Sequence, residues 1–160
     1  MLATAKADTA HLLPAWRRYT GTFYQHAGPA LADAVAGGQV VIISGGYGIA
    51  RADEPIGCYD KVLQLADWPD GLLESALIGE AQRCGAQTVV AFASATTGYA
   101  TLLRPTPWLQ AGIDARLVTI TGVTGGAMSE VPRRLGQAFS AFWNQQRGNY
   151  PPGTTVELLR

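Results

Sequence analysis

A chain of 160 residues has room for one folded domain spanning 1–160 but not comfortably for two. With 48% hydrophobic and 15% charged residues, it has enough apolar surface to exclude a disordered protein. Its formal net charge of zero argues against a protein that binds nucleic acids through a general basic excess.

The sequence shows no targeting or membrane signal. It has no signal-peptide pattern and no apolar run near the ~20 residues of a membrane span, which predicts a cytoplasmic protein. Cys58 and Cys84 lack the C-x-x-C spacing of redox and metal sites and fit a reducing compartment. Cys84 falls on the apolar face of a predicted helix, so we expect a buried free thiol there.

The first elements lead into a buried strand. Residues Met1–Thr4 are expected to be the remnant of a strand whose earlier part is absent from the chain. Residues 29–36 have an amphipathic, helix-like pattern that ends at Gly37-Gly38. The run QVVIIS at 39–44 is continuously apolar and β-branched, which predicts a strand covered on both faces.

A helix and a second strand follow. Apolar residues recur at three- and four-residue spacing over 70–85, which predicts a helix with Asp70 as N-cap and Gly85 as its end. The run TVVAFAS at 88–94 predicts the second buried strand.

The third strand lies between two further helices. Residues 97–104 predict a short helix that ends at the Arg104-Pro105 step, and ARLVTIT at 115–121 predicts the strand.

The last predicted helix, over 131–146, has a clear apolar stripe. Pro132 suits its first turn, and Ser129 is the candidate cap. Arg133 and Arg134 then lie at the helix start, where the helix dipole disfavours cations.

This alternation of helices and strands predicts an α/β fold, a Rossmann-like three-layer domain with a small, mostly parallel sheet. The tail from Asn149 predicts a turn followed by either a short edge strand or a loose end. In open sheets of this kind, ligands bind beyond the carboxyl ends of the strands.

All three predicted strands end in small or hydroxyl residues, namely SGGYG at 44–48, SATTG at 94–98 and TGVTGG at 121–126. Small residues let a ligand approach the backbone, and N–H and hydroxyl groups suit phosphate, carboxylate or a base edge. Parallel strands also commonly need glycine turns, so one such turn alone is a weak signal. The expected ligand-binding residues are Ser44, Gly45, Gly46, Tyr47, Gly48, Ser94, Thr96, Thr97 and Gly125.

The stretch 49–60, directly after the first of these turns, is expected to be a loop that lines one side of the ligand site. It mixes charged and apolar residues with no helical or strand period. The expected catalytic residues are Glu54, Tyr59 and Asp60: a carboxylate as base or acceptor, and a tyrosine to stack on or hydrogen-bond the ligand. Ordinary solvated loop charge is the alternative for both carboxylates.

Other residues give weaker signals. His11 and His26 have no matching ligands at metal spacing, which argues against a metal site. No histidine follows residue 26, so Ser44 lacks an evident base for a hydrolase triad. The run from Trp16 to Tyr19 mixes arginines with aromatics, as a nucleic-acid surface does, or forms a helix end with its aromatics packed inward.

The stretch VVIISGGYGIARADEPIGCYD at 40–60 resembles a signature of the YaaA-like superfamily, in which a Ser-(Gly/Ala)-x-Tyr-Gly turn precedes a proline and a Tyr-Asp or Tyr-Arg pair. The matching residues are Ser44, Gly45, Tyr47, Gly48, Pro55, Tyr59 and Asp60. Upstream, RRYTGTFY at 17–24 is similar to an element of the smaller relatives, and Lys6 corresponds to the lysine after the family's first strand.

This resemblance covers roughly residues 17–66 and implies a role in oxidative stress and DNA protection, or in nucleic-acid base modification for some relatives. We therefore expect a YaaA-like domain with a pocket for a nucleotide, a nucleobase or a similar small anion. Lys6 would add positive charge, no cofactor is expected, and whether the protein is an enzyme is left open.

Two alternatives stand beside this hypothesis. One is a nucleotide-binding protein related to lysine-decarboxylase-like and DNA-processing proteins, in which the TGVTGG turn matters as much as SGGYG. The other is a non-enzymatic interaction domain, because an apolar, weakly charged chain suits a homo-oligomer or a partner surface.

Overall fold

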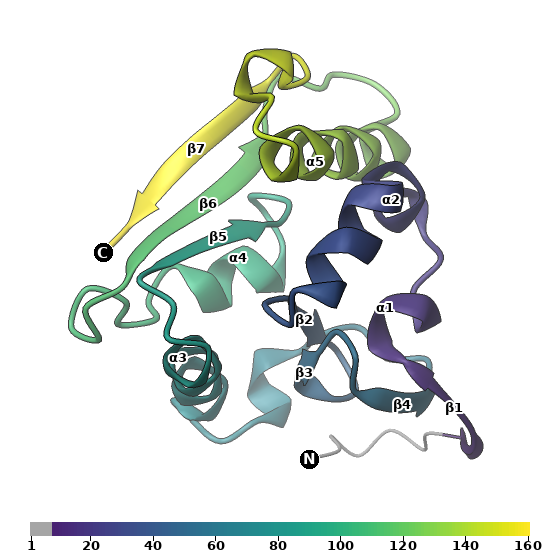
Figure 1. Cartoon of the computed structure of the whole chain (residues 1–160), viewed down its shortest axis with the longest axis vertical. Helices are drawn as coiled ribbons and strands as arrows, with labels where there is room; N and C mark the ends of the chain where they lie inside the picture. Colours follow the sequence, from purple (N-terminus) through teal and green to yellow (C-terminus); the bar gives the residue numbers. More distant parts are fainter. Residues whose placement is uncertain (1–7) are drawn as a thin grey trace.

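Hydrogen bonding divides the strands of this mixed α/β protein among three small sheets. The computed structural model describes residues 8–160 (Figure 1). β1 (Asp8–Pro14) pairs antiparallel with β4 (Pro55–Cys58), and β2 (Val41–Ser44) pairs antiparallel with β3 (Gly48–Arg51).

The third sheet has the order β5–β6–β7 and lies on the side of the molecule away from β1 and β4 (Figure 1). β5 (Thr88–Phe92) and β6 (Asp114–Ile120) are parallel, and β7 (Thr154–Leu159) is antiparallel to β6. Consecutive residues 117–120 of β6 are all buried, so this strand is covered on both faces. The predicted second and third strands and the C-terminal edge strand are thus confirmed.

The predicted first strand forms as β2, but its expected place in a mostly parallel sheet is wrong. The chain reverses after Ser44, so that Ser44 faces Gly48 across an antiparallel hairpin. Gly48 has a φ of 72°, a left-handed conformation that glycine adopts readily. SGGYG is therefore a hairpin turn instead of a strand-to-helix turn. The sequence pattern does not reveal β3 and β4 because strands of four residues are too short to show clear alternation.

α3 (Leu72–Arg83) and α4 (Gly98–Leu103) confirm two predicted helices, with one correction at α3. α3 begins after Gly71 and has no side-chain cap, so Asp70 is not its N-cap. The segment before α3 contains the short 3-10 helix η1 (Leu65–Asp67).

α5 (Ala127–Trp143) begins closer to the TGVTGG turn than predicted, directly after Gly126. Ser129 and Pro132 therefore lie within the helix and not at its cap and first turn. The reason is that the glycines before Ala127 allow the chain to enter the helix without a side-chain cap. A 3-10 turn, η2 (Arg147–Asn149), leads from α5 toward β7.

α2 (Thr22–Ala36) is longer than the predicted helix at 29–36 and is kinked in the middle. The kink lies at Gly28, whose φ of 45° and ψ of −132° are not helical. Pro29 follows, and proline removes the N–H that would continue the helical hydrogen bonds. The predicted segment is only the second half of this helix, because the kink interrupts the helical pattern.

α2 and α5 pack closely and connect the N-terminal part of the molecule to the third sheet (Figure 1). A Cβ atom at Gly136 of α5 would lie 2.4 Å from the carbonyl oxygen of Phe23, so only glycine permits this approach. On the same helix, Phe139 contacts the rings of Phe23 and Phe92 at centroid distances of 6.1 and 5.2 Å.

The structure also bears on the expectations for the cysteines, for membrane-spanning helices and for the N-terminal residues. Both cysteines are free, but Cys84 is half-buried instead of buried, and Cys58 is exposed. Within residues 8–160, no helix has the length and apolar character needed to cross a membrane. The expected strand remnant Met1–Thr4 and the expected site residue Lys6 lie outside the described residues.

Candidate functional site

Ser44, at the end of β2, is the centre of a hydrogen-bond network. Its side chain is 1% exposed, and its Oγ lies 2.6 Å from the hydroxyl of Tyr59. The same Oγ accepts the backbone N–H of Tyr47 at 3.0 Å. The Tyr59 hydroxyl also hydrogen-bonds the hydroxyl of Tyr19, which follows α1 (Ala15–Arg18). This network joins three chain segments and includes three of the predicted site residues.

Five of the chain's six tyrosines gather around this network, and we call them the tyrosine cluster: Tyr19, Tyr24, Tyr47, Tyr59 and Tyr99. The Tyr19 and Tyr24 rings stack with centroids 5.3 Å apart and planes 17° apart. Tyr47 and Tyr59 meet edge to face at 5.5 Å. Tyr99, at the start of α4, interacts electrostatically with Tyr59 and Tyr24. The cluster thus draws on the segment after α1, α2, the β2–β3 hairpin, the segment after β4, and α4.

Burial keeps several of these phenols protonated. It raises the pKa of Tyr19 well above the usual range; the hydrogen bond with Ser44 opposes this shift, and Tyr59 adds to it. Burial likewise raises the pKa of Tyr24 and of Tyr99. These hydroxyls therefore stay neutral hydrogen-bond donors and acceptors to a higher pH than the hydroxyl of an exposed tyrosine does.

The glycines of SGGYG are packed against the protein instead of forming an open ligand floor. A Cβ at Gly45 would lie 2.1 Å from the carbonyl oxygen of Lys61, and one at Gly46 would lie 2.6 Å from the Tyr59 ring. At Gly48 the nearest atom is on the Trp68 ring, 2.9 Å away. These positions need glycine because neighbouring chain segments occupy the space.

The second predicted strand end, SATTG, lies next to the first. Leu63 is the link: a Cβ at Gly45 would be 2.7 Å from its nitrogen, and a Cβ at Gly98 would be 3.5 Å from its oxygen. The two turns therefore lie on either side of one short segment. Within SATTG, the Thr97 hydroxyl donates to the carbonyl of Ser94 at 2.8 Å.

Three other predicted site residues do not join the network. Thr96 is exposed on the SATTG turn, and Asp60 is exposed beside Tyr59. The Glu54 carboxylate accepts the backbone N–H of Arg51 at 3.2 Å. Arg51 and Ser44 lie at opposite ends of the β2–β3 hairpin, so Glu54 is held away from Ser44.

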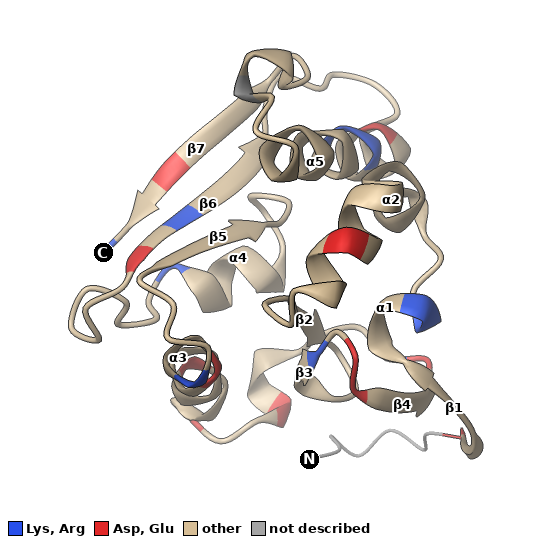
Figure 2. Ribbon diagram, in the orientation of Figure 1, with Lys and Arg blue, Asp and Glu red and all other residues tan. Residues whose placement is uncertain are grey.

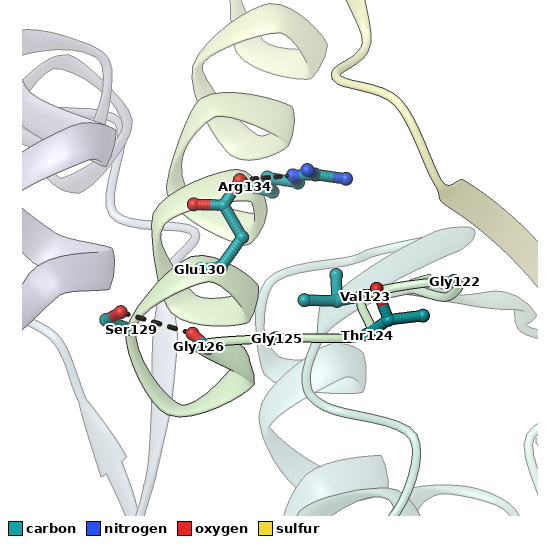
Figure 3. A pocket seen from close by; sticks show the side chains of 8 residues that line it. All are labelled: Gly122, Val123, Thr124, Gly125, Gly126, Ser129, Glu130 and Arg134. Atoms are coloured by element: carbon teal, nitrogen blue, oxygen red, sulfur yellow. Dashed lines mark hydrogen bonds and ion pairs between the residues drawn. The ribbon is translucent and has the colours of Figure 1, made fainter.

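The third predicted strand end, TGVTGG, borders an open hollow of about 310 Å³ at the start of α5 (Figure 3). Its lining residues are Gly122, Val123, Thr124, Gly125, Gly126, Ser129, Glu130 and Arg134. The Glu130 carboxylate pairs with Arg133 at 2.5 Å and with Arg134 at 2.6 Å. These hydrogen bonds lower the pKa of Glu130 to about 2. The two arginines near the helix start thus share one acidic partner, which offsets one of their two positive charges.

A second open hollow, which we call the Tyr19 depression, lies beside the tyrosine cluster and has a volume of about 720 Å³. Its lining residues are Leu13, Trp16, Arg17, Tyr19, Thr20, Tyr24, Gln25, Gly28 and Leu31. The guanidinium of Arg17 lies over the Trp16 ring, 5.0 Å from its centroid, in a cation–π contact.

None of these lining residues was among the predicted site residues, because the depression precedes the first predicted strand in the sequence. Two local signals fell on this region: the mixture of arginines and aromatics from Trp16 to Tyr19, which also fits a helix end, and the resemblance of RRYTGTFY at 17–24 to an element of the YaaA-like relatives. In the structure, Arg17 is exposed, as on a binding surface, whereas Trp16 and Tyr19 are half-buried, as at a helix end whose aromatics pack inward.

Within residues 8–160, no group of histidine, cysteine and acidic side chains is arranged to hold a metal ion. Comparison of the chain with protein-family models, with curated proteins and with solved structures finds no match. The fold and the site together define a mixed α/β protein in which a buried hydroxyl network adjoins an aromatic depression. The YaaA-like resemblance of residues 40–60 stays a prediction from the motif.

Proposed function

We propose that this protein is a YaaA-like domain that binds a small ligand with a planar, nucleobase-like ring in the Tyr19 depression. The observation that carries the proposal is the double position of Tyr19. Its side chain lines the depression, and its hydroxyl is tied through Tyr59 to the buried Ser44 of the SGGYG turn. The motif and the depression are thus parts of one structure.

The lining of the depression suits a flat aromatic ligand. Trp16, Tyr19 and Tyr24 supply aromatic surface, and stacking of a base on such side chains contributes about 1–3 kcal/mol. Thr20 and Gln25 add hydrogen-bonding groups that would orient the ring. A volume of about 720 Å³ lies within the range of small-molecule sites.

The role of the Ser44–Tyr59 pair in this proposal is to position Tyr19. Because the Tyr19 hydroxyl is held by the network, its ring has a defined place in the wall of the depression. Among the hydrogen bonds of residues 8–160, none connects the three hydroxyls to a carboxylate or an imidazole. The proposal is therefore one of binding and does not assign a reaction.

The turns after β2 and β5 approach each other at Leu63, but neither turn lines the Tyr19 depression, so the Rossmann-like expectation of a site at the strand ends is not part of this proposal. A phosphate site at TGVTGG has less support because Glu130 already pairs with both arginines and adds negative charge to that hollow.

A pair of neighbouring leucines on β1 tests the proposal. Leu13 lines the depression and is 42% exposed, whereas Leu12 is 52% exposed and does not line it. Calorimetric titration with nucleobases, nucleosides and nucleotides should show saturable binding to the wild-type protein. Leu13→Trp should weaken that binding about tenfold or more by filling the depression, and Leu12→Trp should leave it unchanged.

Thermal unfolding of both variants checks that each is folded. Equal binding by the two tryptophan variants would place the ligand elsewhere and contradict the proposal. No saturable binding by folded wild-type protein would favour the interaction-domain alternative instead.

A further inference from the structure

We propose that the ligand of the Tyr19 depression is a nucleoside phosphate whose anionic group is bound by Arg17. This inference rests on the proposed function and adds the chemical class of the ligand. It begins from the distribution of charge around the depression.

The chain segment that lines the depression contains cations and no acids. Residues 9–32 contain no aspartate or glutamate but include Arg17 and Arg18, and every lining residue falls between 13 and 31. Figure 2 shows blue on α1 and no red on the first half of α2, with the acidic loop before β4 next to α1, where the N–H of Ala15 donates to the carbonyl of Glu54. Arg17 is the one charged side chain among the lining residues, so the lining itself carries a positive charge that suits an anion.

Neither arginine has a counter-ion among residues 8–160. Arg17 makes a cation–π contact with Trp16 but forms no salt bridge with a described carboxylate. Arg18 donates to the carbonyls of His11 and Ile56 at 2.5 and 3.4 Å, and its buried Nε has no hydrogen-bond partner in the described structure. By contrast, Arg83, Arg104, Arg116, Arg133 and Arg134 each pair with a carboxylate. A guanidinium without a carboxylate beside a ligand-sized hollow is suited to bind phosphate oxygens.

The size and chemistry of the depression agree with a nucleotide. Its volume of about 720 Å³ exceeds what a bare base fills, so room is left for a sugar and a phosphate. Apolar and aromatic side chains make up most of the wall, and Arg17 is the one charged residue in it. A ligand with a stacking ring and an anionic group uses both features.

The kink in α2 is a second, independent observation that supports ligand binding in the Tyr19 depression. Gly28 lines the depression and holds backbone angles that an L-residue rarely adopts, although nothing lies within 4 Å of where its Cβ would be. Such strain is often retained where a ligand binds. Because residue 29 is proline, the carbonyl of Gln25 lacks its usual helical donor, and Gln25 also lines the depression.

The test compares ligands that differ only in the phosphate. Adenosine and cytidine, their 5′-monophosphates and inorganic phosphate are titrated into wild-type protein and two charge-matched variants, Arg17→Gln and Arg116→Gln. Arg116 is an exposed arginine on β6 that pairs with Asp114, far along the chain from the depression. We expect each monophosphate to bind about tenfold tighter than its nucleoside, and Arg17→Gln alone to remove this gain.

The outcomes separate the two proposals. Equal affinity of nucleoside and monophosphate, or a phosphate gain that survives in Arg17→Gln, overturns the present inference and leaves base binding intact. Failure of all nucleosides and nucleotides to bind overturns both, as does binding of inorganic phosphate alone. A short single-stranded oligonucleotide that binds more than about tenfold tighter than the monophosphate also overturns it, because the depression would then be one position of a longer strand-binding surface.

Discussion

The hydroxyl of Ser44 lies 2.6 Å from the hydroxyl of Tyr59, and this contact joins the end of β2 to the segment that follows β4. Both residues belong to the motif at 40–60, so the spacing of that motif has a physical explanation. The intervening chain forms β3 and β4 and returns Tyr59 to the turn that Ser44 begins.

Removal of the Ser44 hydroxyl should destabilise the protein. Ser44→Ala leaves the part-buried N–H of Tyr47 without its acceptor and removes a partner of Tyr59. We expect a loss of about 1–3 kcal/mol in the free energy of unfolding, measured by urea titration. Ser129→Ala is the control, because that hydroxyl is exposed, and should change stability by less than about 0.5 kcal/mol. Equal effects would show that the network adds no stability.

Glycine substitutions should distinguish packed turns from open ones. Gly45→Ala would place a Cβ 2.1 Å from the backbone oxygen of Lys61, which cannot swing aside as a side chain can. We expect a loss of about 3 kcal/mol or more, or failure to fold. At Gly125 of the TGVTGG turn nothing lies within 4 Å, so Gly125→Ala should cost less than about 0.5 kcal/mol. Chemical unfolding of both variants measures this, and a tolerated alanine at Gly45 would contradict it.

The tyrosine cluster should make the protein sensitive to alkali. The pKa of Tyr19 and that of Tyr24 are raised in the folded state by burial, so above about pH 10 the folded protein holds more protons than the unfolded chain. This contribution is fully present below pH 10 and is lost as pH rises through the folded-state values. The urea midpoint should therefore fall with rising pH. Tyr19→Phe should flatten the decline, and Tyr150→Phe, outside the cluster, should not.

The pairing of Glu130 with two arginines should appear at acid pH. Hydrogen bonds from Arg133 and Arg134 lower the pKa of Glu130 from 4.5 to about 2. Its contribution to stability is therefore present above pH 4.5 and is lost as the pH falls to about 2. An NMR titration of the Glu130 carboxyl measures the shift directly. Replacing both arginines with glutamine should return its pKa toward the ordinary value, and an unchanged titration would refute the assignment.

Local patterns in the sequence predict much of the secondary structure. The apolar runs at 88–94 and 115–121 form β5 and β6, and the periodicity over 70–85 forms α3. These features depend on near neighbours in the chain, because a helix or a buried strand places residues a few positions apart on one face. The motif at 40–60 likewise pointed to Ser44 and Tyr59, which the structure joins.

The tertiary structure alone decided how these elements combine. Whether β2 pairs with β3 or with a parallel neighbour depends on hydrogen bonds between strands, which apolar periodicity does not encode. The tyrosine cluster brings together residues from 19 to 99, and the Tyr19 depression forms where α1, β1 and the kink of α2 meet. Composition and spacing thus determined which residue types were present for a site, and only the packing of distant segments determined that Tyr19 would connect the buried Ser44 with a surface hollow.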